Sequence, residues 1–327
     1  MDATTIHELG VRFQQLLHEK RQQTNAFSRE LMGLSHTPLL YENESTLDAA
    51  LEVIPLELIY ASAEEEEAKV TEYGYQDHVI RALLKWFKRD FFKWINEPPC
   101  SNGHATTLSG MTVANATEVA EGSSRVEIYT CSTCGETRRF PRYNNPAVLL
   151  RTREGRCGEW ANCFTMLCRA MGSRVRWVWN SEDHVWTEVW SDKCQRWIHC
   201  DACETAFDEP NIYARGWGKK MAYVIGFSTD GAMDVTRRYV RSQDHSLPRT
   251  KASEETVKRA LAAVSSLRRR AFSVDDQRRL QRQDEAEGKE LASYRTVNES
   301  PLTTHESQPR QTGTAEWKAA RGEDGSH

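Results

Sequence analysis

The chain has 327 residues, 39% of them hydrophobic and 28% charged, which is typical of a soluble globular protein with a substantial core. Its formal net charge of -4 gives no general attraction to nucleic acid or to an anionic membrane surface. No segment reaches the roughly 18 consecutive apolar residues that a membrane span requires. We therefore expect neither a nucleic-acid partner nor a membrane span.

Charged residues interrupt the first 20 positions of the chain, which therefore lack the continuous apolar run of a secretory signal. We expect a cytoplasmic protein, with the nucleus as a second location. The nine cysteines would then be reduced. Cysteines with functional spacing are accordingly candidates for metal ligands or nucleophiles rather than for disulfides.

Residues 5–22 are predicted to form an amphipathic helix, because Ile6, Leu9 and Phe13 fall on one stripe. We treat residues 1–24 as a separate N-terminal helix. Two roles are open for it: the apolar stripe docks on the protein's own core, or it presents a face to a partner.

Residues 76–94 have apolar side chains at helical spacing, which predicts a core helix that stops before Pro98. A stretch rich in Gly, Ser and Thr follows. We predict that residues 98–142 form a small module within a catalytic core of residues 25–245.

The centre of the chain is predicted to be a helix followed by antiparallel strands, which defines an α+β fold. The helix covers residues 158–171, and a hairpin with its turn at Asp230 comes later. The segments with alternating apolar residues between them are 175–179, 184–190 and 197–201.

Residues 246–327 form a charged C-terminal tail. Residues 251–272 could form one charged helix. From Ser273 onward the chain is polar and lacks apolar periodicity, so we expect the tail to be largely disordered.

Cys157 is the candidate nucleophile, because it directly precedes the predicted helix over residues 158–171. The positive end of a helix dipole favours the thiolate, which is the form that attacks a carbonyl carbon. Backbone N–H groups at the same helix end can also bind the oxyanion that develops during attack.

His184 and Asp201 are the candidate base and its partner. His184 opens one predicted strand and Asp201 ends the next, and adjacent antiparallel strands can bring such ends within hydrogen-bond reach. His184 could then accept the thiol proton while Asp201 fixes its tautomer. His199 is the rival base, because it shares a strand face with Asp201.

Cys131 and Cys134 are candidate metal ligands, because a Cys-x-x-Cys turn can hold two ligands of a tetrahedral zinc ion. Cys100 offers a third ligand, and His104 could complete a set of three Cys and one His. A redox role for the Cys-x-x-Cys pair is less favoured, because no βα unit follows it.

Four ordered sequence blocks together resemble cytoplasmic peptide:N-glycanase in its fungal form, and the resemblance covers about residues 75 to 240. The blocks are Gly155-Arg156-Cys157-Gly158-Glu159-Trp160, Trp179-Asn180-Ser181-Glu182-Asp183-His184-Val185-Trp186, His199-Cys200-Asp201-Ala202-Cys203-Glu204 and Trp217-Gly218-Lys219-Lys220-Met221.

This resemblance implies a papain/transglutaminase-like core with a small zinc-binding insertion. It implies that Cys157 is the nucleophile, His184 the base and Asp201 the third member of the triad. Glu204 matches a substrate-binding position of the family. Cys100, Cys131 and Cys134 would bind a structural zinc ion, although the family's second Cys-x-x-Cys is incomplete here.

The same resemblance implies a deglycosylating amidase that releases intact glycans from misfolded N-glycoproteins, converting Asn to Asp, in endoplasmic-reticulum-associated degradation. Denatured N-glycosylated proteins would be its substrates. A Rad23-type ubiquitin receptor is an expected partner of the N-terminal helix. Two alternatives remain open: transglutaminase-type acyl transfer by the same triad, and a non-catalytic scaffold for protein interactions.

Overall fold

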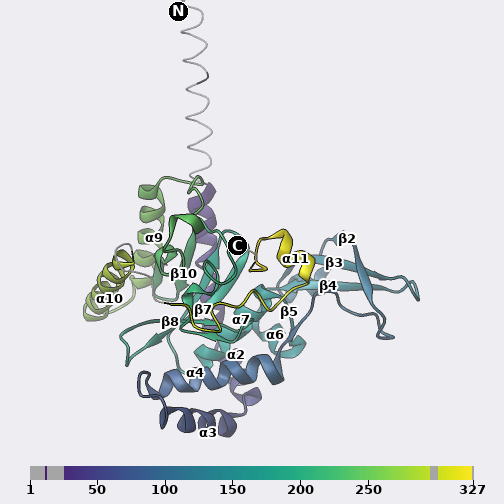
Figure 1. The fold of residues 1–327 in the computed structure, drawn as a ribbon, viewed down its shortest axis with the longest axis horizontal. Coiled ribbons are helices and arrows are strands. Elements are labelled where there is room, and N and C mark those ends of the chain that lie inside the picture. Colours follow the sequence, from purple (N-terminus) through teal and green to yellow (C-terminus); the bar gives the residue numbers. More distant parts are fainter. Residues whose placement is uncertain (1–11, 13–25, 295–300, 326–327) are drawn as a thin grey trace, which may run out of the picture.

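The computed structural model describes residue 12, residues 26–294 and residues 301–325 (Figure 1). Apart from residue 12, the predicted helix over residues 5–22 lies outside this part of the chain. None of the helices that are described has the length and apolar character needed to cross a membrane.

Helices form the first part of the described chain. Residues 26–34 are helical, and four further elements follow: η1 Thr37–Glu42, α2 Glu44–Val53, α3 Leu56–Glu67 and α4 Tyr75–Trp86. On α4 the buried residues include Val79, Ile80 and Leu83, as the helical spacing predicts.

The predicted helix over residues 76–94 is shorter in the structure. After α4 one turn of π-helix, η2 Phe87–Phe91, ends the helical part. The chain then becomes extended in β1 Lys93–Trp94, which pairs in parallel with β5 Glu154–Gly155. The N–H of Lys93 donates to the carbonyl of Arg153, so backbone pairing to a distant segment ends the helix before Pro98 does.

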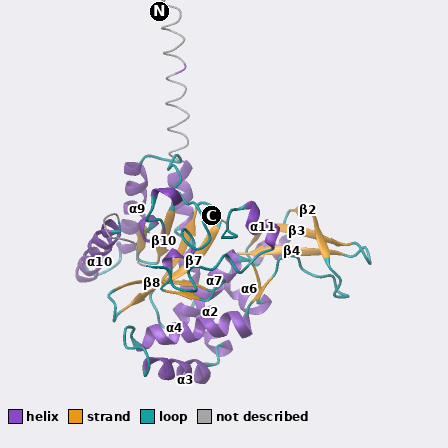
Figure 2. Ribbon diagram, in the orientation of Figure 1, coloured by secondary structure: helices purple, strands orange, loops and turns teal. Residues whose placement is uncertain are grey.

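The predicted module contains a separate three-stranded antiparallel sheet in the order β2-β3-β4. Its elements are β2 Thr106–Thr112, α5 Ala116–Ala120, β3 Ser123–Cys131 and β4 Thr137–Tyr143. This sheet projects to one side of the main body (Figure 2).

The main body is a six-stranded sheet in the order β11-β10-β6-β7-β8-β9, in which every pair is antiparallel. After α6 Pro146–Thr152, the chain forms α7 Cys157–Ala170 and then enters this sheet. The strands are β6 Val175–Asn180, β7 His184–Ser191, β8 Arg196–Asp201, β9 Ala206–Phe207, β10 Val224–Ser228 and β11 Gly231–Asp234. The predicted α+β arrangement of one helix followed by antiparallel strands is confirmed.

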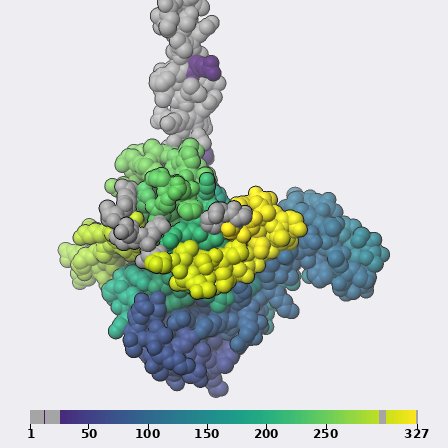
Figure 3. Space-filling view, in the orientation of Figure 1, coloured from purple at the N-terminus to yellow at the C-terminus, as the bar shows by residue number. Residues whose placement is uncertain are grey.

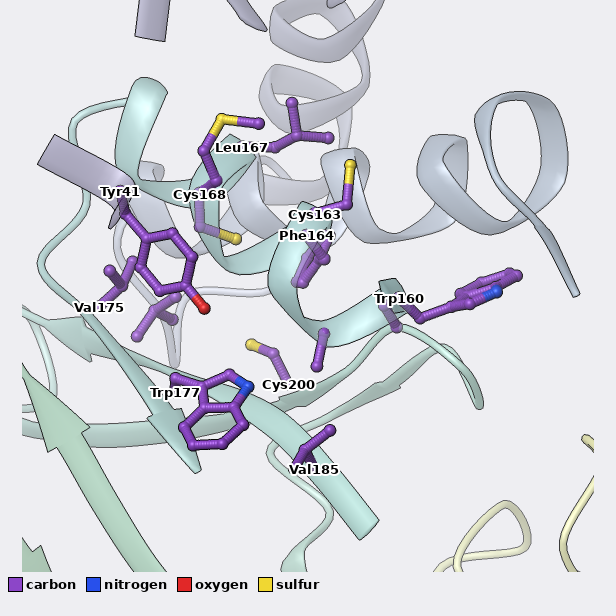
Figure 4. Close-up of a cluster of buried hydrophobic side chains, with 14 of the residues drawn as sticks. Tyr41, Trp160, Cys163, Phe164, Leu167, Cys168, Val175, Trp177, Val185 and Cys200 are labelled. Carbon is purple, nitrogen blue, oxygen red and sulfur yellow. The ribbon is translucent and has the colours of Figure 1, made fainter. Parts of the chain in front are cut away.

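The main hydrophobic core lies between α7 and one face of the sheet (Figure 4). Phe164 and Leu167 on α7 are fully buried, and Val185 on β7 packs against the same core. Because side chains alternate along a strand, His184 and Trp186 on β7 point to the opposite face. A second, smaller core covers that face and contains Trp186.

The second core is formed with the segment that follows β9. Helices η3 Pro210–Ile212 and α8 Thr236–Tyr239 contribute to it, whereas η4 Gln243–His245, which follows α8, has no buried residue. Tyr213 and Tyr239 are buried against Trp186, and Trp217 is buried against Tyr213 and His184. These aromatic side chains therefore surround the end of β7 at which His184 lies.

The prediction of a largely disordered tail is wrong for much of residues 246–327. Helix α9 Glu254–Arg269 packs on β11, and α10 Val274–Ser293 follows it. Glu287 on α10 pairs with Arg176 at 2.7 Å and with Arg238 at 2.9 Å, and all three side chains are buried. Hydrophobic periodicity does not detect a helix that buried ion pairs hold in place.

Residues 301–325 are also placed on the main body, and we call them the C-terminal strap. The strap contains α11 Ala315–Ala320 and runs across the main body as far as the module (Figures 1 and 3). Arg310 and Glu323 of the strap are 0% exposed. Buried charged groups again explain why a polar sequence adopts a defined structure.

Candidate active site

Cys157 is the first residue of α7 and is partly exposed. Arg156 is the extended N-cap residue, and its N–H donates to the carboxylate of Glu159 at 2.9 Å. A Cβ atom at Gly155 would lie 2.4 Å from Cβ of Glu159, so the backbone can approach the helix here only at a glycine. The sequence around the thiol thus fixes where α7 begins.

A network of ion pairs joins the start of α7 to the sheet of the module. Glu127 on β3 pairs with Arg156 at 2.7 Å and with Arg142 at 3.0 Å. Arg142 also pairs with Glu159 at 2.7 Å. Burial alone would raise the pKa of Glu127, but hydrogen bonds from Arg156 and Tyr129 and the charges of the two arginines lower it to about 2. The module therefore supports the position of Cys157.

His184 and Asp201 lie together, with Nε2 of His184 2.8 Å from Oδ2 of Asp201. Both side chains are buried. A carboxylate only accepts hydrogen bonds, so Nε2 carries the proton and Nδ1 is the nitrogen left for proton exchange. Asp201 also accepts hydrogen bonds from Tyr213 Oη at 2.9 Å and from the N–H of Cys203 at 2.8 Å. These contacts fix the carboxylate and, through it, the imidazole.

His199 reaches Asp201 only through Tyr213. Its Nε2 lies 2.7 Å from Tyr213 Oη, and because that hydroxyl donates to Asp201, it accepts from His199. Burial lowers the pKa of His199, which favours the neutral imidazole. Of the two candidate bases, His184 is the one beside Cys157.

The charges of the site favour a thiolate and an imidazolium. Burial raises the pKa of Cys157, but hydrogen bonding and charge from His184, together with the charge of Arg310, outweigh it, and the pKa lies below its ordinary value. Burial lowers the pKa of His184, but the charge and hydrogen bond of Asp201 outweigh it, and this pKa is raised. The two groups are therefore poised to exchange a proton.

Two cavities meet at Cys157. One of about 350 Å³ is lined by Cys157 and His184 together with Trp177 and Trp179. The other, of about 370 Å³, lies between the module and the C-terminal strap, and Trp317 contributes to its wall. A substrate could therefore extend on both sides of the thiol.

Glu204 is 2% exposed and is not among the described residues that line either cavity. Its carboxylate accepts hydrogen bonds from the N–H of Gln311 at 2.8 Å and from the hydroxyl of Thr312 at 2.7 Å. Its observed contacts are thus with the C-terminal strap, and its predicted contact with substrate stays a prediction.

Tyr213 and Arg310 are site residues that the sequence reasoning missed. Tyr213 lies in an irregular segment, where no periodic pattern marks a functional position. Nη2 of Arg310 lies 3.5 Å from Nδ1 of His184, although Arg310 belongs to the tail that was expected to be disordered. No local pattern in residues 310–323 signals this contact, because Arg310 and His184 lie 126 positions apart in the chain.

The structure brings the four candidate metal ligands together. The ligand atoms of Cys100, His104, Cys131 and Cys134 all lie within 4.8 Å of one another. Sγ of Cys134 is 3.8 Å from Sγ of Cys100, and the edge of a tetrahedral zinc–thiolate site is about 3.8 Å for metal–sulfur bonds of about 2.3 Å. The donor set and its geometry fit a metal ion, with His104 in the fourth position.

Comparison with known families defines the fold. Residues 106–202 match the transglutaminase-like superfamily, and residues 179–292 match the Rad4 transglutaminase-like domain. The crystal structure of Rad4-Rad23 bound to a 6-4 photoproduct UV lesion aligns with a TM-score of 0.51 at 13% identity, covering 88% of this chain and 61% of that chain. The chain is therefore a transglutaminase-like protein that carries a cysteine and a histidine in one cavity.

Full-length relatives define the family more narrowly. A protein of Yarrowia lipolytica named peptide-N(4)-(N-acetyl-beta-glucosaminyl)asparagine amidase is 47% identical over 90% of this chain and 83% of its own length. The protein of the same name from Saccharomyces cerevisiae is 41% identical, over 97% of this chain and 89% of its own. The mouse protein is 40% identical over 88% of this chain and 44% of its own. The chain belongs to the peptide:N-glycanase family, as the sequence blocks indicated.

Proposed function

We propose that this protein hydrolyses the amide bond between an N-linked glycan and asparagine. The reaction converts Asn to Asp and releases the intact glycan. The observation that carries the proposal is the cavity that holds Cys157 at the start of α7 beside the His184–Asp201 pair. The names of the relatives supply the substrate class.

Cys157 is the nucleophile in this mechanism. Its thiolate attacks the side-chain carbonyl carbon of the glycosylated Asn, and His184 gives its Nδ1 proton to the leaving nitrogen as the C–N bond breaks. The glycosylamine departs and a thioester remains. Water then gives a proton to His184 and attacks the thioester, which releases Asp and restores the thiolate. Asp201 holds the imidazole in the required tautomer throughout.

A denatured glycoprotein incubated with the protein tests this function. Loss of the glycan, together with heavy oxygen from labelled water in the new Asp, is the expected result, and Cys157→Ala is the control without activity. A labelled amine in the product in place of oxygen would indicate acyl transfer instead. Glycans that stay attached under reducing conditions would reject the amidase.

We infer that the metal of the module is zinc. Cys100, His104, Cys131 and Cys134 would hold it, and three thiolates with one imidazole are a common donor set for structural zinc. When bound, the ion supplies a cross-link between the loop at Cys100 and the β3–β4 turn. Metal analysis of protein purified without added metal tests the assignment.

We also propose that a Rad23-type ubiquitin receptor binds the N-terminal segment of residues 1–24, which the sequence predicts to be helical. Support comes from the family resemblance and from the apolar stripe at Ile6, Leu9 and Phe13. Binding should be lost when this segment is deleted while deglycosylation is retained. Equal binding of the receptor by the full chain and by the chain that lacks residues 1–24 would contradict the proposal.

The cellular setting that fits these proposals is the cytoplasm, with the nucleus as a second location. Misfolded glycoproteins in endoplasmic-reticulum-associated degradation would be the substrates there. Cell fractionation tests the location. The effect of Cys157→Ala on the turnover of a misfolded glycoprotein tests the setting and separates an enzyme from a non-catalytic scaffold.

A further inference from the structure

Arg310 is the residue of the C-terminal strap that comes closest to the proposed proton exchange. Its side chain is 0% exposed, and Nη2 lies 3.5 Å from Nδ1 of His184. Nδ1 is the nitrogen that faces away from Asp201 and serves Cys157. A fixed positive charge therefore stands beside Nδ1 of His184, where it opposes protonation of the imidazole and favours the thiolate of Cys157.

Several contacts hold the guanidinium in place. Nη1 pairs with Glu323 at 2.6 Å, and Nε donates to Thr312 at 3.3 Å. The guanidinium carbon lies 4.8 Å from the ring centre of Trp217 and 4.5 Å from that of Trp317. These contacts leave the group little freedom to turn away from the site.

The cations around Glu323 outnumber its single negative charge. Besides Arg310, the carboxylate pairs with Lys219 at 2.6 Å and with Arg321 at 3.1 Å. Arg321 also pairs with Asp183 at 2.9 Å, so three cations face two carboxylates and positive charge is in excess among these groups. A buried cation is costly without a nearby anion, and a thiolate at Cys157 would supply one.

We propose that Arg310 is a further catalytic residue, whose fixed charge stabilises the thiolate of Cys157 and so raises the fraction of enzyme ready to attack. This proposal rests on the proposed amidase function. The C-terminal strap then completes the active site, and Glu204 contributes by binding the backbone at Gln311 and Thr312.

The other groups that act on Cys157 come from β7 and from the turns before β7 and after β8. His184 on β7 lowers the pKa of the thiol, Arg310 lowers it further, and Asp183 raises it. The charge of the Cys157 thiolate in turn raises the pKa of Cys203. Arg310 thus lowers the pKa of the Cys157 thiol by its charge without taking part in the proton exchange itself.

The first test measures the pH dependence of alkylation of Cys157 by iodoacetamide, without substrate, in the full chain. In Arg310→Gln the midpoint for thiolate formation should move up by about one pH unit or more, because a nearby opposite charge is lost. The value of kcat/KM near neutral pH should fall by roughly tenfold, mainly through kcat. Arg310→Lys should recover part of both effects.

Glu323→Gln gives the opposite sign. Removal of this carboxylate leaves the charge of Arg310 less neutralised, so the midpoint for thiolate formation should move down. A purely structural role would loosen the C-terminal strap in both variants and shift the midpoint in one direction only. Gln308→Ala, an exposed and uncharged position of the C-terminal strap, is the control without a change of charge, and its midpoint should stay where it is in the parent protein.

Equal midpoints in the parent protein and a folded Arg310→Gln variant would overturn the proposal, as would shifts of the same sign in Arg310→Gln and Glu323→Gln. Should Arg310→Gln fail to fold, the sign of the Glu323→Gln shift decides alone. Deglycosylation by the parent protein is assayed in parallel. A parent protein that leaves glycans attached rejects the amidase, whereas a cleaving parent with unmoved midpoints rejects only the role of Arg310.

Discussion

Asp201 accepts a hydrogen bond from Nε2 of His184 at 2.8 Å, and this one contact decides which imidazole nitrogen serves the thiol. With the proton of the neutral ring fixed on Nε2, the lone pair of Nδ1 can accept the proton of Cys157. The hydrogen bond of Asp201 to one ring nitrogen of His184 thus sets the tautomer, and the other ring nitrogen is left to react with the thiol.

Asp201→Asn should lower kcat by about 10⁴-fold with a small change in KM. An amide can donate to Nε2, which moves the ring proton to Nδ1 and removes the acceptor for the thiol. Steady-state kinetics on a denatured glycopeptide measures the effect. Asp192→Asn, an exposed change next to the same sheet, is the control that should keep full activity.

The rate of acylation should be bell-shaped in pH. Cys157 has a lowered pKa and is anionic above it, whereas His184 has a raised pKa and is cationic below it, so the ion pair exists between the two. The acid limb should lie below 9.0, the ordinary value of a thiol, and the alkaline limb above 6.5, the ordinary value of histidine. A profile of kcat/KM against pH gives two apparent pKa values, which belong to the coupled Cys157–His184 pair rather than to either residue alone. An acid limb at or above 9.0 would contradict the electrostatic account.

His104→Ala should weaken metal binding by roughly 10²-fold, since about a quarter of the roughly 10–16 kcal/mol typical of a structural zinc site would be lost. His104→Cys should restore tight binding with four thiolates. Competition with a chelator and metal analysis measure both. His36→Ala, at an exposed histidine far from the cluster in sequence, should have no effect.

Glu287→Gln should destabilise the protein by roughly 3–5 kcal/mol, because it leaves Arg176 and Arg238 buried with less negative charge. Burial would raise the pKa of Glu287, but the two arginines lower it from 4.5 to about 2. A depressed carboxyl pKa contributes stability above the ordinary value, and this contribution is lost as the pH falls from about 4.5 toward 2.

Chemical denaturation as a function of pH tests this prediction. The difference between the parent protein and Glu287→Gln should be large at neutral pH and shrink in acid. Glu285→Gln, an exposed change on the same helix, should alter stability by less than about 0.5 kcal/mol. Hydrogen exchange on α10 should increase in Glu287→Gln alone.

The central fold could be predicted because its core obeys simple periodicity. Strands β6 to β8 alternate in the sequence as they do in the sheet, and Gly172 ends α7 in the left-handed conformation that favours glycine. His184 and Asp201 were paired in the prediction because both lie at ends of neighbouring strands. These predictions were possible because the interacting residues lie close together in the sequence and the strands have a regular geometry.

The tail could not be predicted by the same reasoning. Glu287 and Arg310 each meet partners more than a hundred positions away in the chain, and no local pattern encodes such pairing. Polar composition was interpreted as disorder, whereas the structure uses those charges as buried contacts. Tyr213 was missed for a related reason, because its role depends on the irregular path of the chain after β9.

Strand β3 carries Cys131 at its end and Glu127 within it, so one strand belongs both to the metal cluster and to the ion pairs at the start of α7. Two binding events that order the same element are linked, and the linkage acts equally in both directions. A glycopeptide that tightens the start of α7 would therefore lower the concentration of free metal at which the module fills. The occupancy of the metal site would then depend on the amount of substrate, and the affinity for substrate would depend on the supply of metal, both through strand β3.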